Sequence, residues 1–365
     1  MPAWKVAIIG AGKIGETIAS FLHSSDAYDV VLTDSTEAAL DRVELPIEKK
    51  VIDASNATSL VDGLRGVDAV LSAAPFFLTP TIAAAAKEIG AHYFDLTEDV
   101  ASTEAVRKLA EGSKSVFIPQ CGLAPGFVGI AGAHLAHEFD KIEKLVLRVG
   151  ALPLFPTNAL KYNMTWSTDG LINEYCNPCD AIVDGTPAKV QPLEGAEIIS
   201  IDGTDYECFN TSGGLGTLCE TLDGKASYVA YKTVRYPGHL SIIKMLLHDL
   251  GLIERRDLLG EVFDTALPRT EQDVVIVFCT ATGWKNGTYM ERSYLNKSLA
   301  QKIGGKRRSA IQITTAAGIC ANLELVRTGI LPNQGFLSQE DVPFEMFLET
   351  EFGQYYRMGD VKDAA

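Results

Sequence analysis

The stretch Val6-Ala7-Ile8-Ile9-Gly10-Ala11-Gly12-Lys13-Ile14-Gly15 decides the fold of this chain. Its first four residues are apolar and partly β-branched, which predicts a strand buried on both faces. The glycines follow in G-x-G-x-x-G spacing, and residues 16–22 continue with helical periodicity. Gly10 permits a tight turn, Gly12 lets backbone approach a diphosphate, and Gly15 lets the helix lie close to the strand. The stretch predicts a dinucleotide site, and a strand–turn–helix without a ligand is the alternative.

An acidic residue stands where such a site needs one. Asp34 ends the predicted strand 29–34, about 20 residues past the glycines, where a carboxylate accepts hydrogen bonds from a ribose and repels a 2′-phosphate. The next residues, Ser35-Thr36-Glu37, include no Arg or Lys to bind that phosphate. NAD is therefore predicted as the cofactor in preference to NADP.

Strands and helices alternate over the first 120 residues. Strands are predicted at 6–9, 29–34, 50–53, 69–75, 92–97 and 116–119, with helices after the glycines and at 35–43, 58–64, 79–89 and 102–110. Six such strands predict a Rossmann-type, doubly wound parallel sheet that binds ligands at the carboxyl ends of its strands. The residues expected to hold the cofactor are Gly10, Gly12, Lys13, Ile14, Gly15, Asp34, Ser35, Asp53, Ala54, Ala73, Ala74, Pro75, Thr97, Cys121 and Gly122.

The character of the sequence changes after the turn 121–126. A helix is predicted at 127–139, and strands at 145–149, 161–166, 180–190, 197–209, 228–235, 274–280 and 289–295. Asp184-Gly185 and Asp202-Gly203 lie between alternating segments and predict hairpins. With helices at 238–250 and 256–263, this part predicts an α+β domain with an open, mainly antiparallel sheet. A long apolar helix at 307–327 is expected to return to the first domain.

These elements predict two domains. Residues 1–126 form the dinucleotide-binding domain, completed by about 306–365, and residues 127–305 form a domain for substrate binding and dimerisation. An open antiparallel sheet leaves edges to cover, so a homodimer or larger homo-oligomer is expected.

Composition limits the possible partners. The chain has 365 residues, of which 47% are apolar and 22% charged, as in ordinary globular proteins. A net charge of −15 argues against nucleic acid and anionic membranes as partners. The first strand begins too early to leave a signal peptide, and the seven scattered cysteines suit a reducing cytoplasm. The lone Cys176-x-x-Cys179 is interpreted as packing thiols, so no metal is predicted.

Several motifs resemble one enzyme family. Cys121-Gly122-Leu123-Ala124-Pro125-Gly126 resembles the turn that closes the cofactor domain in the saccharopine dehydrogenase superfamily. Saccharopine reductases usually carry Asp in the position of Ala124 and an Asp-His pair where this chain has Val128-Gly129. Residues 162–167, 170–175 and 235–239 look like the L-lysine 6-dehydrogenase branch instead. The resemblance covers nearly the whole chain.

That resemblance implies a reaction. The branch oxidises the ε-amino carbon of L-lysine with NAD and gives allysine, which cyclises, and ammonia. A hydride leaves that carbon only when the ε-amine is neutral, so a base or a desolvated pocket must lower its pKa from about 10.4. The α-carboxylate needs an anion-binding group, for which the planar guanidinium of arginine is best suited. The remaining alternatives are a saccharopine-type enzyme and a non-catalytic NAD-binding protein.

The candidate residues for this chemistry each have a second interpretation. Arg235 is the candidate carboxylate clamp or a surface ion-pair residue, and His239 orients substrate, moves a proton or merely packs at a helix start. Asp95, with Glu98 nearby, either pairs with the amine or bonds to ribose, and Lys232 is a weaker candidate base. The sequence does not single out the base. Candidate pocket residues, which are equally explained as core or hairpin residues, are Tyr162, Trp166, Asn173 and Thr211.

Overall fold

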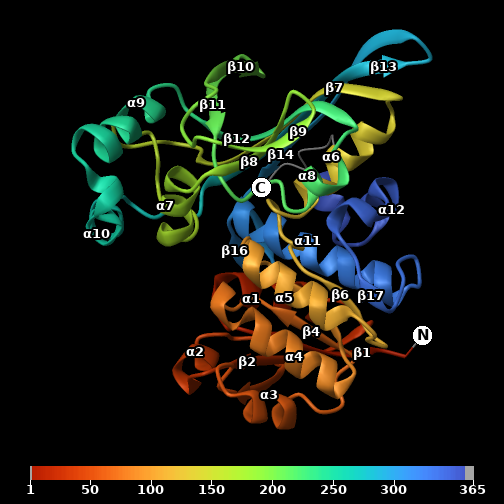
Figure 1. The fold of residues 1–365 in the computed structure, drawn as a ribbon. Coiled ribbons are helices and arrows are strands. Elements are labelled where there is room, and N and C mark those ends of the chain that lie inside the picture. Colours follow the sequence, from red (N-terminus) through yellow and green to blue (C-terminus); the bar gives the residue numbers. More distant parts are fainter. Residues whose placement is uncertain (1, 358–365) are drawn as a thin grey trace. The chain divides into compact units, whose positions relative to one another are not determined.

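The computed structural model describes residues 2–357. Among them, contacts define two compact units: unit 1 holds residues 2–130, 302–306 and 312–357, and unit 2 holds residues 131–301 and 307–311 (Figure 1). The part of the predicted cofactor domain at 358–365 lies outside the described residues. Across residues 2–357, every helix is too short or too polar to cross a lipid bilayer.

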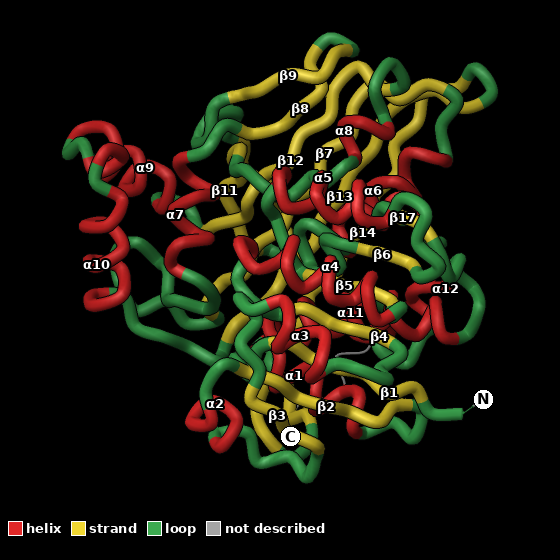
Figure 2. Tube along the Cα trace, turned by 60° about the horizontal axis from the view of Figure 1, so that its bottom comes forward, coloured by secondary structure: helices red, strands yellow, loops and turns green. Residues whose placement is uncertain are grey.

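Unit 1 is built on a parallel seven-stranded sheet in the order β17-β6-β5-β4-β1-β2-β3 (Figure 2). The doubly wound parallel sheet predicted from the sequence is confirmed. Its strands are β1 (Trp4–Ile9), β2 (Tyr28–Asp34), β3 (Glu48–Val51), β4 (Ala69–Ser72), β5 (His92–Asp95), β6 (Val116–Ile118) and β17 (Gly335–Phe336). The prediction of six strands missed β17, because a two-residue strand has no periodic pattern.

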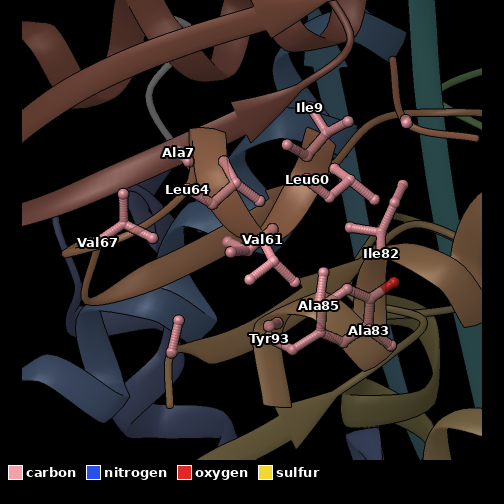
Figure 3. Packing of buried hydrophobic residues seen from close by; sticks show 14 of the residues in the cluster. Ala7, Ile9, Leu60, Val61, Leu64, Val67, Ile82, Ala83, Ala85 and Tyr93 are labelled. Carbon is pink, nitrogen blue, oxygen red and sulfur yellow. The ribbon is translucent and has the colours of Figure 1, made fainter. Parts of the chain in front are cut away.

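Helices cover both faces of this sheet. Ala7 and Ile9 of β1 share an apolar cluster with side chains of α3 and α4 (Figure 3), and Val106 and Ala110 of α5 belong to the same cluster. Ile8 points to the other face and lies near Gly15 of α1, so α1 covers that side. The helices of unit 1 are α1 (Lys13–His23), α2 (Glu37–Asp41), α3 (Ala57–Gly63), α4 (Thr79–Ile89), α5 (Val100–Ala110) and α12 (Phe344–Glu349); α6 (Phe127–His137) and α11 (Ala310–Arg327) contribute to both units.

Unit 2 is organised around a mixed sheet in the order β10-β11-β12-β7-β13-β14, with β8 paired to β12 and β9 to β8. Its strands are β7 (Lys141–Pro153), β8 (Cys179–Val183), β9 (Thr186–Val190), β10 (Glu197–Ile201), β11 (Thr204–Asn210), β12 (Ala226–Arg235), β13 (Asp273–Lys285) and β14 (Thr288–Leu299). The short strands β15 (Gln301–Ile303) and β16 (Lys306–Arg308) form a separate pair. The mainly antiparallel character is confirmed, although β7 and β12 pair in parallel.

Helices of unit 2 gather beside this sheet. Side chains of α7 (Thr168–Cys176), α9 (His239–Lys244) and α10 (Arg256–Ala266) share one apolar cluster (Figure 1). The predicted helix 238–250 is split, because α9 passes into a π-helix at Met245–Asp249. The short α8 (Leu218–Thr221) completes the set. Helix α7 was not predicted from the sequence, although Ser167 caps it by accepting a hydrogen bond from the Gly170 N–H.

The strand predicted at 161–166 is wrong. Asn158 occupies the backbone groups that a strand partner would bond: its Nδ2 donates to the Tyr162 carbonyl at 2.6 Å, and its Oδ1 accepts from the Tyr162 N–H at 3.3 Å. Lys161 has φ of 53°, which is incompatible with an extended strand. The segment is therefore an ordered loop with a single bridge from Met164 to Arg269.

Within unit 2, a buried carboxylate caps the start of α11. Asp273 is 0% exposed, and its two oxygens accept hydrogen bonds from the N–H groups of Ala310 and Ile311 at 2.5 and 3.1 Å. We expect Asp273→Ala to lower the free energy of unfolding by about 1–2 kcal/mol, because the capping bonds and the interaction with the helix dipole are lost. Urea unfolding measures the change. Asp205→Ala, at an exposed strand position, is the control, and equal losses in both variants would contradict the capping role.

Candidate functional site

Unit 1 presents its candidate residues along one edge of the sheet. Gly10, Ser35, Ala73 and Thr97 all lie just after the carboxyl ends of parallel strands. Of the other residues predicted to hold a cofactor, Asp34 ends β2, Lys13, Ile14 and Gly15 begin α1, and the rest follow strand ends. Because parallel strands end at the same edge, these residues share it. The geometry of this edge is that of a ligand-binding edge in an open α/β sheet.

The glycine turn has the shape that a diphosphate requires. A Cβ on Gly15 would lie 1.8 Å from the Gly10 carbonyl oxygen, so only glycine lets α1 start this close to the turn. A Cβ on Gly12 would meet nothing within 4 Å, so the backbone there is open. Gly12 is the N-cap of α1 and offers no side-chain cap to the first N–H groups of the helix. An anion suits these N–H groups and the positive end of the helix dipole.

Asp34 joins this turn to the end of β2. Its Oδ2 accepts a hydrogen bond from the Ala11 N–H at 2.9 Å, and its Oδ1 accepts from the Thr36 N–H at 3.2 Å. The carboxylate thus lies beside the turn where a ribose would follow the diphosphate. Asp53, by contrast, is bound to its own turn, since the Ser55 hydroxyl and N–H both donate to it.

Asp95 lies at the same edge but is buried, with 1% of its surface exposed. Its Oδ1 accepts from the N–H groups of Thr97 and Gln120 at 2.9 and 3.0 Å, which ties the end of β5 to the turn after β6. Its Oδ2 has no hydrogen-bond partner within the described residues. Burial raises the pKa of Asp95 to about 6, against the lowering effect of the Gln120 and Thr97 N–H groups.

The turn after β6 is tightly packed. Its peptide bond Ala124–Pro125 is cis, and a Cβ on Gly126 would lie 2.1 Å from the Gly122 carbonyl oxygen. The Cys121 thiol is buried and donates to the Ile118 carbonyl at 2.9 Å. Cys121 and Gly122 can therefore meet a cofactor only through their backbone in this conformation.

Unit 2 brings most of the candidate substrate residues into one buried cluster. Arg235 lies over the ring of Tyr162 with 5.1 Å between the guanidinium carbon and the ring centre, and Trp166 donates to the Tyr162 hydroxyl at 3.1 Å. His239 meets the ring of Tyr162 edge-on. Arg235 and His239 are 3% and 1% exposed. The structure thus joins Tyr162, Trp166, Arg235 and His239, which lie far apart in the sequence.

Tyr175, which sequence reasoning did not select as a site residue, links the two central members of this cluster. Its hydroxyl accepts a hydrogen bond from Arg235 Nε at 3.0 Å and lies 2.9 Å from His239 Nε2. His239 Nδ1 lies 2.9 Å from the Leu160 carbonyl, which only accepts, so Nδ1 carries the proton. Nε2 then accepts from the Tyr175 hydroxyl. The hydrogen bonds run in one direction, from Arg235 through Tyr175 and His239 to Leu160.

The same contacts decide what His239 can do. Burial, followed by the charge of Arg235, lowers the pKa of His239 to about 3. The imidazole stays neutral at neutral pH, and both of its nitrogens are bonded within the chain. This placement favours the orienting role for His239 over proton transfer.

Other candidates lie around this cluster or away from it. Asn173 accepts from Arg256 at 3.4 Å, and the neighbouring Ser212 hydroxyl donates to the Asn173 carbonyl. Thr211 is 1% exposed, and its hydroxyl has no hydrogen-bond partner in the part of the chain that the structure describes. Lys232 lies three residues before Arg235 in β12 and so points to the opposite face of the sheet, where it donates to the Gly195 carbonyl at 2.7 Å.

The buried charge of Asp95 makes stability depend on pH. An unfolded Asp has a pKa near 3.9, so between about pH 4 and 6 the folded protein holds the proton more tightly. The free energy of unfolding therefore falls as pH rises through this window. Asp95→Asn removes this titrating group, so its free energy of unfolding should not fall in the same way. The difference in free energy of unfolding, variant minus wild type, should rise by about 1 kcal/mol between pH 5.0 and pH 7.5, as measured by urea unfolding. Asp41→Asn, at an exposed position, is the control; equal pH dependence in all three proteins would contradict the assignment.

Comparisons with known proteins agree with this geometry. Residues 6–116 match the family model for the saccharopine dehydrogenase NADP binding domain, and residues 122–350 match the model for the saccharopine dehydrogenase C-terminal domain. The fold is similar to apo saccharopine dehydrogenase (L-Glu forming) from Saccharomyces cerevisiae, with a TM-score of 0.81, 16% identity, and 95% of this chain and 96% of that chain covered. It is less similar to C. glutamicum DAP dehydrogenase in complex with DAP, with a TM-score of 0.52, 12% identity, and 97% and 98% covered. The chain belongs to the saccharopine dehydrogenase family and is a nicotinamide-dependent oxidoreductase that acts on an amino acid.

Proposed function

We propose that this enzyme oxidises the ε-amino carbon of L-lysine, with NAD as the oxidant. The carbon loses a hydride and the nitrogen a proton, and water then hydrolyses the resulting imine to allysine and ammonia. The bound dinucleotide supplies the hydride acceptor. The observation that carries the proposal is the cluster of Tyr162, Trp166, Arg235 and His239, because it unites the sequence motifs that resemble the L-lysine 6-dehydrogenase branch.

Arg235 is the proposed partner of the α-carboxylate. Its guanidinium is held by Tyr175 through Nε and by the Val234 carbonyl through the terminal nitrogen NH1. Its remaining edge reaches Glu174 at 3.5 Å, the longest of the three contacts. A substrate carboxylate would take that edge with a charge-assisted hydrogen bond in a site partly closed to water.

The start of α6 supports an L-lysine dehydrogenase reaction over saccharopine formation. Where saccharopine reductases usually carry an Asp-His pair, this chain has Val128-Gly129, and Val128 is fully buried. Among the candidate proton acceptors, Asp95 fits best, because its pKa of about 6 leaves it ionised at neutral pH.

A substrate screen tests the proposed reaction. With NAD, we expect NADH to form with L-lysine and not with saccharopine. The reverse result would assign a saccharopine-type enzyme, and no turnover of any amino acid would contradict the proposal.

The role of Arg235 is tested with a shortened substrate. Wild type should prefer lysine strongly over cadaverine, which keeps the reacting amine but lacks the carboxylate. Arg235→Ala should reduce kcat/KM for lysine roughly 30- to 1000-fold and lose most of that preference. The dissociation constant for NAD should stay unchanged, and an unaltered lysine preference would make Arg235 a purely structural residue.

Asp34 is proposed to select NAD. We expect kcat/KM to be at least about 10-fold higher with NAD than with NADP, because the carboxylate bonds to ribose and repels a 2′-phosphate. Asp34→Ala should narrow this ratio mainly by weakening NAD binding, which fluorescence titration of the dinucleotides measures. Asp41→Ala, which removes an exposed carboxylate of α2, is the control. Equal use of both dinucleotides by wild type would refute the role of Asp34.

A further inference from the structure

The Arg235 cluster contains a carboxylate that the proposed function does not use. Glu174 is the residue before Tyr175 in α7, and its Oε2 lies 3.5 Å from Arg235. The Glu174 side chain is 19% exposed, whereas the Arg235 side chain is 3% exposed. The arginine thus lies deeper, and the glutamate lies closer to solvent.

Arg235 is held by shorter hydrogen bonds than the contact that joins it to Glu174. Tyr175 and the Val234 carbonyl bind Arg235 at 3.0 and 3.1 Å, and His239 fixes the Tyr175 hydroxyl in turn. The contact to Glu174 is a single long hydrogen bond, not the bidentate pairing that strong Arg–carboxylate bridges form. Opening it leaves the guanidinium in place.

The loop after β11 lies beside Glu174. In this loop, Thr211 is 1% exposed, and its hydroxyl has no hydrogen-bond partner among residues 2–357. The loop that carries it is bound to α7, because the Ser212 N–H donates to the Glu174 carbonyl at 3.1 Å.

We propose that Glu174 and Arg235 together form a receptor for the zwitterionic headgroup of an α-amino acid, in which Arg235 binds the α-carboxylate and Glu174 binds the α-ammonium. The inference rests on the proposed function and adds Glu174 as a residue that determines substrate specificity. The long contact between the two charges of this ion pair opens, and each charge then binds one charge of a ligand headgroup that is also neutral overall. No net charge enters the buried cluster, so the electrostatic cost of burial stays low.

The pairing predicts which substrates are rejected and by which residue. L-Lysine, cadaverine and 6-aminohexanoate share the reacting amine; cadaverine lacks the carboxylate, and 6-aminohexanoate lacks the α-ammonium. Wild type should prefer lysine over both. Glu174→Gln keeps the size of the side chain and removes its charge, so it should lose roughly 10- to 100-fold of the preference for lysine over 6-aminohexanoate. Its preference for lysine over cadaverine should stay largely intact.

The experiment measures kcat/KM for the three amines with wild type, Glu174→Gln, Glu174→Asp and Glu194→Gln. Glu194 makes an exposed ion pair with Lys244 at 2.8 Å, so Glu194→Gln is a matched control and should behave as wild type. Glu174→Asp keeps the charge and should retain part of the preference over 6-aminohexanoate. Thermal unfolding confirms that each variant is folded.

Three results would overturn the inference. In the first, wild type fails to distinguish lysine from 6-aminohexanoate. In the second, Glu174→Gln leaves kcat/KM unchanged for all three amines. In the third, Glu174→Gln lowers kcat/KM equally for all three, which would make Glu174 only a structural counter-ion of Arg235. Failure of the proposed function looks different, because wild type would then oxidise none of the three amines. In that case, calorimetry measures binding of L-lysine and of 6-aminohexanoate to the same variants. Tighter binding of lysine by wild type but not by Glu174→Gln supports the role of Glu174, and equal binding of the two ligands by wild type overturns it.

Discussion

The burial of the Arg235 guanidinium is the constraint around which the candidate substrate site is built. A buried charge must be hydrogen-bonded and paired to be stable. Tyr175 and Glu174 supply two of its contacts from the end of α7, and the Val234 carbonyl supplies a third. Tyr175 then needs an acceptor, which is His239 at the start of α9, and His239 needs the Leu160 carbonyl. One buried charge thereby determines how β12, α7, α9 and the 158–162 loop meet.

Local signals predicted much of the fold. The glycine turn has to satisfy close backbone contacts, and Asp-Gly pairs at the hairpins adopt the positive φ values that tight turns need, such as 51° and 81° at Asp184 and Gly185. What local signals missed depends on distant partners. The 161–166 segment looks like a strand until the Asn158 amide occupies its backbone groups, and β17 exists only because β6 leaves an edge to pair with.

The candidate site was predictable to a similar extent. Arg235, His239, Tyr162 and Trp166 are residue types that stand out at turns and in motifs, and the structure brings them together. Tyr175 and Glu174 lie in the 170–175 motif but were not selected as site residues, because their importance follows from the burial of a charge about 60 residues away in the sequence. Ser167, as a helix-capping residue, was the signal that could have predicted α7. A helix predicted there would have placed Glu174 and Tyr175 together in its last turn.

The mixed sheet of unit 2 carries buried cations on both faces. The way these cations are paired differs between the faces, and the difference indicates which cation can bind a ligand. On one face, Glu197 binds Arg148 at 2.7 Å and Lys232 at 3.2 Å, while Arg148 also donates to Thr280 and Lys232 to the Gly195 carbonyl. One carboxylate thus pairs with two cations through short contacts. Opening these contacts would leave buried charges without a partner of opposite charge. On the other face, Arg235 is held by neutral groups and touches its carboxylate through one long contact. Only the second arrangement can release its carboxylate and keep its cation in position, which is what a site that exchanges an internal ion pair for a ligand requires.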